Sequence, residues 1–236
     1  QQMDGQSLWT ESDQKLFLLP PISGHPFPYL VFSDNNIFKK ANVDVYAIGD
    51  LEFGYSMEDC SNLIDLSIKF VDFIKERISP KDKISFAGWC FGGYLALEIA
   101  RQLMIQDYKV NKMIMIDSPN PMLCEDMTNY SDEEIRNRHK FIEEEGVLGG
   151  TFTERKIIDN LKKNTYIASN YSPHSFEYPI EMILARSYED MAKIEYWKGI
   201  SPDINIYKTD LSHSEIFYSK NIDFIATLIT SIIYKI

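Results

Sequence analysis

Six residues, Gly88-Trp89-Cys90-Phe91-Gly92-Gly93, constrain the fold of this chain more than any other segment. They lie between a strand-like run at Lys83–Ala87 and an apolar helical pattern from about Phe91 to Gln106. Small residues two before and two after Cys90 let a strand turn sharply into a helix, with the central residue in a strained backbone conformation. This context predicts a nucleophile elbow, with the Cys90 sulfur above the N-terminus of the helix. The structural alternative is a buried cysteine in a glycine-rich turn.

Strand and helix patterns alternate on both sides of this turn. Short apolar runs predict strands at Lys15–Leu19, Asn42–Ile48, 83–87, Lys112–Ile116, 179–185 and 203–208. Helical periodicity predicts helices at Ser56–Ile78, with Ser56 and Asp59 at its start and Pro80 after its end, at 91–106 and at Asn221–Tyr234. Together they predict an α/β protein of the α/β-hydrolase fold, with a mostly parallel central sheet flanked by helices.

The pattern changes between about residues 121 and 178, where no strand is apparent. Two charged helical stretches, Asp132–Glu145 and Thr153–Ser169, are separated by Gly146, Gly149 and Gly150. We expect a helical insertion above the sheet. The length of 236 residues suits one domain, 1–236, with a core of about 14–120 and 179–236 and the insertion at about 121–178.

Composition excludes several other classes of protein. A net charge of −11 argues against nucleic acid or an anionic membrane as the main partner. Three cysteines without a CxxC pair, and no histidine cluster, predict neither a disulfide framework nor a metal site. No apolar run approaches the roughly 20 residues of a membrane helix, and residues 1–13 lack a signal-peptide pattern. We therefore expect a cytoplasmic protein without a bound cofactor.

A cysteine nucleophile needs a base, and in this fold the base follows the last strand. The chain has four histidines. His25 precedes the turn, His139 falls in a charged helical stretch, and His174 follows a proline in the insertion. His213 follows the last predicted strand and precedes the last helix, which makes it the candidate base, against the alternative of a surface-loop histidine.

The acid and the oxyanion donors have less distinctive signals. Asp117 ends the strand after the elbow helix, whereas Glu189 or Asp190 follows the next strand, and spacing alone favours Asp117 only slightly. One oxyanion donor should be the backbone N–H of Phe91, which follows the nucleophile. The other should come from the loop after the first strand, where Ile22 is the first residue with an N–H because two prolines precede it.

These residues resemble a known family. Gly88–Gly93 resembles the GWSFGG elbow of thioesterase domains from nonribosomal peptide and polyketide synthases. Further similar segments are Leu95–Leu103, Met115–Ser118, Phe17–Gly24, and Trp197 with the His213 loop. The resemblance runs from about Leu16 to the C-terminus, and its landmarks occur in order at fitting intervals.

The resemblance implies that Asp117 is the acid and that residues 121–178 form a lid. It also implies a substrate held as a thioester on the phosphopantetheine arm of an acyl or peptidyl carrier protein, in the same megasynthase, and released by hydrolysis or cyclisation. The early segment lacks the arginine-containing loop of stand-alone editing thioesterases, which favours a terminal domain.

Basic residues of the insertion are candidates for binding an acidic carrier. They form two groups, Arg136, Arg138 and Lys140, and Lys156, Lys162 and Lys163. Solvated helix faces explain either group more simply.

One departure from the family concerns Cys90, since the usual nucleophile is serine. Some members use cysteine, and a serine replaced to trap acyl intermediates would give the same sequence. Two other functions fit the same residues: a small-molecule hydrolase of the dienelactone-hydrolase type, and a hydrolase-fold binding module without activity. The long insertion and the tryptophan in the elbow favour the thioesterase.

Overall fold

A parallel sheet forms the centre of the computed structural model, which describes residues 13–33, 35–49, 60–139, 141–187 and 190–235 (the backbone only at 141–153 and 190). Its six strands are β1 (Gln14–Leu19), β2 (Val43–Ala47), β3 (Lys83–Trp89), β4 (Val110–Ile116), β5 (Ile180–Leu184) and β6 (Ile204–Lys208). They are ordered β2-β1-β3-β4-β5-β6, and every pairing is parallel. The predicted fold class is confirmed, and each predicted strand is present with ends shifted by at most two residues.

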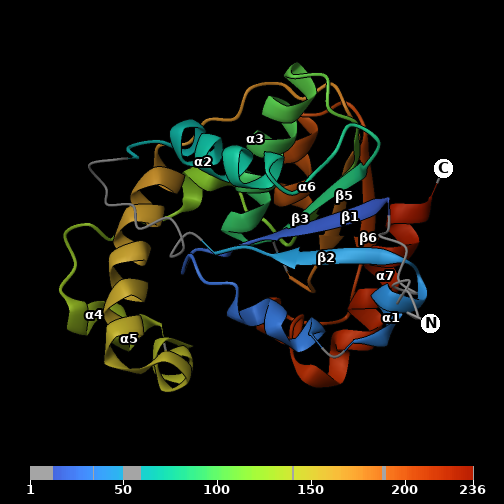
Figure 1. Cartoon of the computed structure of the whole chain (residues 1–236). Helices are drawn as coiled ribbons and strands as arrows, with labels where there is room; N and C mark the ends of the chain where they lie inside the picture. Colours follow the sequence, from blue (N-terminus) through green and yellow to red (C-terminus); the bar gives the residue numbers. More distant parts are fainter. Residues whose placement is uncertain (1–12, 34, 50–59, 140, 188–189, 236) are drawn as a thin grey trace.

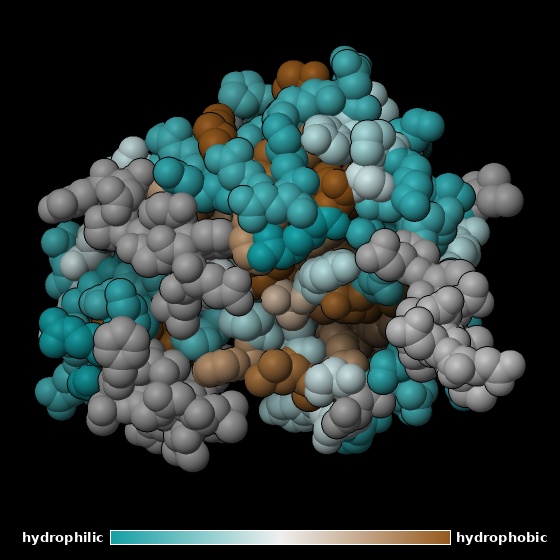
Figure 2. Space-filling view, viewed as in Figure 1, coloured by the Kyte–Doolittle hydropathy of each residue, from teal (hydrophilic) through white to brown (hydrophobic). Residues whose placement is uncertain are grey.

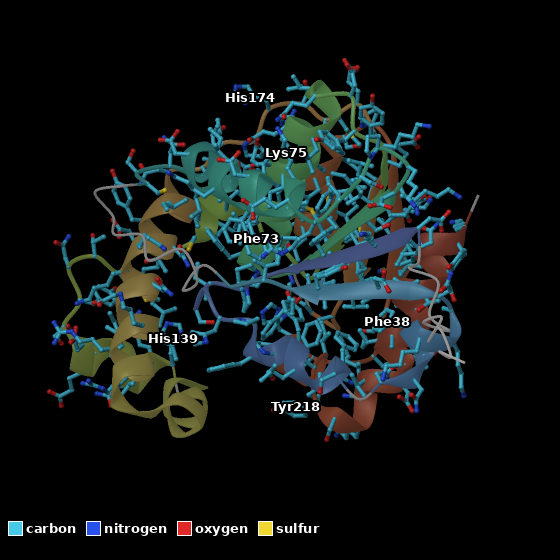
Figure 3. The ribbon with its side chains drawn as sticks, viewed as in Figure 1. Phe38, Phe73, Lys75, His139, His174 and Tyr218 are labelled. Atoms are coloured by element: carbon cyan, nitrogen blue, oxygen red, sulfur yellow. The ribbon has the colours of Figure 1, made fainter. Side chains whose placement is uncertain are left out.

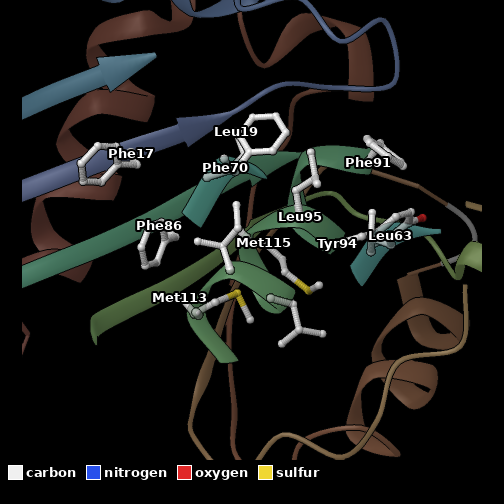
Figure 4. Close-up of a cluster of buried hydrophobic side chains, with 14 of the residues drawn as sticks. Phe17, Leu19, Leu63, Phe70, Phe86, Phe91, Tyr94, Leu95, Met113 and Met115 are labelled. Atoms are coloured by element: carbon white, nitrogen blue, oxygen red, sulfur yellow. The ribbon is translucent and has the colours of Figure 1, made fainter. Parts of the chain in front are cut away.

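Helices cover both faces of this sheet (Figure 1). One face carries α2 (Leu63–Lys75), α3 (Phe91–Ile105) and α6 (Asp190–Lys198), and the other carries α1 (Asn36–Lys40) and α7 (Ile222–Tyr234). Side chains alternate along a strand, so Phe17 and Leu19 of β1 join the first core and Leu16 and Leu18 join the second. Figure 4 shows part of the first core, in which Phe17 stacks on Phe86.

The helix predicted from Ser56 begins later than expected. Among the described residues, α2 starts at Leu63, with Asn62 as its N-cap, whereas Ser56 lies outside the described residues. The Asn62 side chain accepts a hydrogen bond from the Asp65 backbone N–H at 2.9 Å and donates one to the Asp65 carboxylate at 2.7 Å. This reciprocal pair satisfies an amide at the start of the helix, and it explains why the helix begins there.

The insertion contains the short 3-10 helix η3 (Pro121–Leu123), α4 (Asp132–Arg138) and α5 (Phe141–Ser169), which lie beside the sheet layers in Figure 1. The predicted break at Gly146, Gly149 and Gly150 is wrong, because α5 continues through all three. A glycine costs a helix only about 1 kcal/mol. The helix boundary instead falls at His139, whose backbone has φ −124° and ψ 79°.

Short elements without clear periodicity were not predicted. They are α1, α6 and the 3-10 helix η1 (Phe27–Phe32). None of the helices in the described ranges is both long and apolar enough to cross a bilayer. The face shown in Figure 2 is mostly hydrophilic, with apolar residues in small separate patches.

Close packing of glycines joins the elbow to its surroundings. A Cβ added to Gly88 would lie 1.9 Å from the carbonyl oxygen of Gly92. A Cβ on Gly92 would lie 2.4 Å from the carbonyl oxygen of Leu19, at the end of β1. Both contacts involve backbone atoms, so a side chain at either position has to displace the main chain.

We predict that Gly88→Ala lowers the free energy of unfolding by about 3 kcal/mol, because the new methyl group overlaps the Gly92 backbone. Urea denaturation measures the change. Gly199→Ala is the control, since its Cβ would meet the nearest atom, the Tyr196 carbonyl oxygen, at 3.2 Å. Equal denaturation midpoints for the two variants would contradict the packing argument.

Candidate active site

Cys90 occupies the turn between β3 and α3 in a backbone conformation that L-residues rarely adopt. Its φ is 55° and its ψ is −119°. The turn is fixed on both sides: the Cys90 N–H donates to the Ile116 carbonyl at 2.9 Å, and the Ser118 hydroxyl donates to the Cys90 carbonyl at 2.7 Å. Cys90 is partly exposed and free. A strained residue held by this many contacts is typical of functional sites.

Asp117 and His213 meet next to this turn. Asp117 follows β4 and has a φ of 47°, with its N–H donating to the Ile183 carbonyl at 2.7 Å. His213 starts the 3-10 turn η4 (His213–Glu215), where Ser212 and Glu215 form a capping box. The His213 Nδ1 lies 2.6 Å from Asp117 Oδ2. The Asp117 side chain is 1% exposed and that of His213 is 44% exposed, so the pair spans the boundary between core and solvent.

The electrostatics of this group favour a protonated His213. Burial opposes the charged imidazole, but hydrogen bonds with Asp117 and Cys90 outweigh it and raise the pKa of His213 to about 9. Burial also opposes the charged Asp117, yet its hydrogen bonds with His213 and Lys193 hold the pKa of that carboxyl below its usual range. The structure therefore brings together Cys90, His213 and an ionised Asp117.

Trp89 packs directly on His213. Their ring centroids are 4.8 Å apart, with an interplanar angle of 32°. The Trp89 backbone N–H donates to the Tyr29 hydroxyl at 3.0 Å, and that hydroxyl donates to the Leu19 carbonyl at 2.6 Å. An indole face favours a cationic imidazole, and Tyr29 ties the elbow to the end of β1. The packing of Trp89 on His213 was not predicted. The bond to Tyr29 was not predicted either, because Tyr29 lies 60 residues before Trp89.

The two predicted oxyanion donors are positioned by different helices. Phe91 is the first residue of α3, where a backbone N–H has no partner within the helix. The Ile22 loop is held by α5: Asn164 Nδ2 donates to the Ile22 carbonyl at 2.9 Å, and Asn160 Nδ2 donates to the Ser23 carbonyl at 3.1 Å. These asparagines, four residues apart on one helix face, were not predicted to contribute to the site.

A model of the thioesterase domain matches residues 14–232 of this sequence. The chain belongs to the thioesterase domain family. The thioesterase domain is 36% identical over 108 residues to a non-reducing polyketide synthase of Pseudevernia furfuracea, covering 45% of this chain and 5% of that protein. It is also 30% identical over 115 residues to the thioesterase pytI of Aspergillus terreus, covering 45% of this chain and 37% of pytI.

Solved thioesterase structures share the fold. The NocB thioesterase domain, solved as a covalent complex with a fluorophosphonate nocardicin G analog, superposes with a TM-score of 0.78 at 20% identity, covering 95% of this chain and 96% of that one. A four-domain nonribosomal peptide synthetase, AB3403, gives a TM-score of 0.73 at 20% identity, covering 96% of this chain and 20% of that one.

The other candidate residues of the thioesterase domain lie elsewhere. Figure 3 shows His139 on the insertion and His174 on the loop over α3. His25 is 3% exposed, and burial lowers its pKa to about 4. Asp190 is the first residue of α6, and Glu189 lies outside the described residues.

The basic groups of the insertion are largely paired within the chain. Arg136 contacts Glu154 at 2.5 Å, Arg138 contacts Glu125 at 2.7 Å, and Lys162 contacts Asp132 at 2.8 Å. The Lys163 side chain is buried, and Lys140 lies outside the described residues. These pairings agree with the simpler explanation of helix faces that carry balanced charge.

Two further features bear on ligands. The described part of the chain has no group of three His, Cys, Asp or Glu residues placed to hold a metal ion. A hollow of about 430 Å³ lies between η1, α1 and β2, and Cys90, Asp117 and His213 are not among its lining residues.

We predict that Asp117→Asn lowers the pKa of His213, because it removes the carboxylate that offsets burial. An NMR titration of the imidazole resonances, assigned with His213→Gln, measures the effect. In the wild type His213 should stay protonated at neutral pH and lose its proton near pH 9. A wild-type midpoint at the ordinary value, or one unaffected by Asp117→Asn, would contradict the described hydrogen bond.

Proposed function

We propose that this thioesterase domain releases an acyl or peptidyl chain from the phosphopantetheine thioester of a carrier protein, through an acyl-enzyme on Cys90. The observation that carries the proposal is the 2.6 Å contact between His213 and the buried Asp117, next to the strained turn that carries Cys90. Family membership supports the reaction class, and the geometry of the site supports the roles that we propose: Cys90 as nucleophile, His213 as base and Asp117 as acid.

In the first half of the reaction, the Cys90 proton already resides on His213, whose raised pKa favours the imidazolium, and the sulfur attacks the thioester carbonyl as a thiolate. A bond forms between Sγ and the carbonyl carbon, and the bond to the pantetheine sulfur breaks. The imidazolium then returns its proton to that departing thiolate. In the second half, His213 removes a proton from water or from a hydroxyl or amine of the chain itself, and the oxygen or nitrogen bonds to the acyl carbon while the bond from that carbon to Cys90 Sγ breaks. The imidazolium returns the proton to Sγ, and the product is the free acid or a ring.

The carbonyl oxygen gains negative charge in both halves. The backbone N–H groups of Phe91 and Ile22 are the proposed donors to it. The position of Phe91 at the start of α3 supports this role, since the helix dipole also favours negative charge there. For Ile22 the support is its loop, whose carbonyls are fixed by Asn160 and Asn164.

A cysteine in place of the usual serine changes the energetics. Transfer from a carrier thioester to Cys90 exchanges one thioester for another, so this step is nearly balanced. The acyl-enzyme keeps its activation, whereas a serine ester would lose part of it. Cysteine therefore suits a demanding second step, such as closing a strained lactone or attack by a weak nucleophile.

The wider context is also part of the proposal. The chain spans about 5% of the first polyketide synthases that it matches, so we propose that it works on a carrier protein of the same megasynthase. Residues 1–236 form a single thioesterase domain, in which 121–178 act as a lid over the site. The packing of α5 against the Ile22 loop supports that role.

We predict that incubation with an acyl-pantetheine thioester adds one acyl mass to the protein, and that Cys90→Ala abolishes the addition. Intact-mass spectrometry detects the adduct, and Cys124→Ala is the matched control because Cys124 is also partly exposed. Equal loading of the wild type and Cys90→Ala would refute the proposal.

A panel of N-acetylcysteamine thioesters then separates the two outcomes of release. A product with the mass of the bound acyl chain plus one water indicates hydrolysis. A product with the mass of the substrate minus N-acetylcysteamine indicates cyclisation.

We further predict that Asn164→Ala slows acyl loading about tenfold while leaving the His213 titration unchanged. The substitution removes the donor to the Ile22 carbonyl and lets the loop move, which is milder than losing an oxyanion donor outright, a loss of about 100- to 1,000-fold. Asn170→Ala, at an exposed position just after the same helix, is the control. Normal loading by Asn164→Ala would show that α5 does not set the position of the loop.

A further inference from the structure

Asp117 has a second partner besides His213. The Lys193 ammonium lies 2.9 Å from Asp117 Oδ1, and His213 Nδ1 lies 2.6 Å from Oδ2, so each carboxylate oxygen contacts one basic group. The backbone N–H of Ala185 also approaches Oδ1 at 3.3 Å. The Lys193 side chain is 11% exposed and that of Asp117 is 1% exposed, which places the pair largely away from solvent.

The position of Lys193 is determined by the helix that carries it. Lys193 and Trp197 are four residues apart on α6 and therefore share a face. The fully buried Trp197 donates from Nε1 to the Ser118 carbonyl at 2.9 Å, next to the residue that Lys193 contacts. The Ser118 hydroxyl in turn donates to the Cys90 carbonyl at 2.7 Å. One helix face is thus anchored to both the acid and the turn that carries the nucleophile.

Burying a lysine is unfavourable unless an opposite charge compensates it. Here Asp117 supplies that charge, and it also serves His213. The negative charge of one carboxylate is therefore shared between an ammonium group and an imidazole. Without Lys193, this carboxylate would keep the Ala185 N–H and His213 as partners, with no second cation beside it, and would hold the imidazolium more strongly.

This competition matters most after acylation. In the free enzyme, hydrogen bonding with Cys90 and Asp117 raises the pKa of His213 to about 9 against the effect of burial. An acylated sulfur carries neither a proton nor a negative charge, so Asp117 then remains as the group that favours the imidazolium. His213 must be neutral at this stage, because it has to accept a proton from the second nucleophile.

We propose that Lys193 is a positioning residue for this second step: its ammonium group fixes Asp117 Oδ1 and shares the carboxylate charge, so that His213 can give up its proton after acylation. The inference rests on the proposed acyl-enzyme mechanism. The titratable groups that face His213 are Asp117, from the end of β4, and Cys90, from the elbow. Asp117 also faces Lys193, which belongs to α6. Glu215, in η4 with His213, accepts hydrogen bonds from Ser212.

The first test uses Cys90→Ala, which removes the thiol as acylation does. The imidazole of His213 is titrated by NMR in this background, alone and combined with a substitution of Lys193. Lys193→Met removes both the donor and the charge, Lys193→Gln keeps a donor without the charge, and Lys193→Arg keeps the charge. We expect a higher titration midpoint with Lys193→Met and with Lys193→Gln, and little change with Lys193→Arg. Lys198→Met, at an exposed position on α6, is the control and should leave the midpoint unchanged.

The second test follows the decay of the acyl-enzyme between pH 6 and pH 9 by intact mass, with Cys90 present. For every unit by which the His213 midpoint rises, decay on the acid side should slow about tenfold, with a plateau reached at higher pH. Lys193→Arg should restore the wild-type profile. A role in helix packing alone would lower thermal stability in all three variants without moving the profile.

Each test can give a negative result independently of the other. If the His213 midpoint is the same in Cys90→Ala alone and in its combinations with Lys193→Met and Lys193→Gln, the role of Lys193 is overturned, whatever the reaction. Absence of acyl loading on Cys90 would overturn the proposed function, while the NMR comparison would still decide whether Lys193 shifts His213. If Lys193→Met does not fold, Lys193→Gln provides the same comparison, because it retains a side chain of similar length and polarity.

Discussion

The contact between the Gly88 α-carbon and the Gly92 backbone is the constraint on which the site depends. A Cβ there would lie 1.9 Å from a carbonyl oxygen, so the turn closes only with glycine. Because Gly92 also lies against the Leu19 carbonyl, the same turn sets the distance from β3 to the end of β1, where the Ile22 loop begins. Cys90 lies between these two glycines and has a φ of 55°. Hydrogen bonds with Ile116, the last residue of β4, and with Ser118, which follows Asp117, hold this strained conformation.

The site is supported from elements that are distant in sequence. Helix α6 reaches Asp117 and Ser118 through Lys193 and Trp197, and helix α5 reaches the Ile22 loop through Asn160 and Asn164. In both cases two polar side chains four residues apart bond to one short loop. Each loop is thereby oriented by a rigid helix, which is the arrangement expected where reacting groups must be held within a fraction of an ångström.

Much of the fold could be predicted from the sequence, because buried parallel strands leave apolar runs and the elbow leaves a glycine signature. The meeting of Asp117 and His213 also follows from topology, since both come after strands of one sheet. The break at Gly146–Gly150 was predicted wrongly, because local propensity is weak compared with helix continuity. Lys193 was missed for another reason. A lysine in a short helix without clear periodicity is usually solvated, and only the tertiary contact with Asp117 distinguishes it.

In the mechanism that we propose, Cys90 and Lys193 address the same physical problem. A thiol beside an imidazole transfers its proton readily, so the first half of the reaction needs little help from Asp117. The second half starts from an acylated sulfur, and its nucleophile, water or a hydroxyl, is far less acidic than a thiol. If the imidazolium were stabilised too strongly, His213 could not accept the proton of this second nucleophile. A carboxylate that also contacts a buried ammonium group still orients His213, but it stabilises the imidazolium less. A cysteine enzyme of this fold therefore gains more from a cation behind its aspartate at deacylation than at acylation.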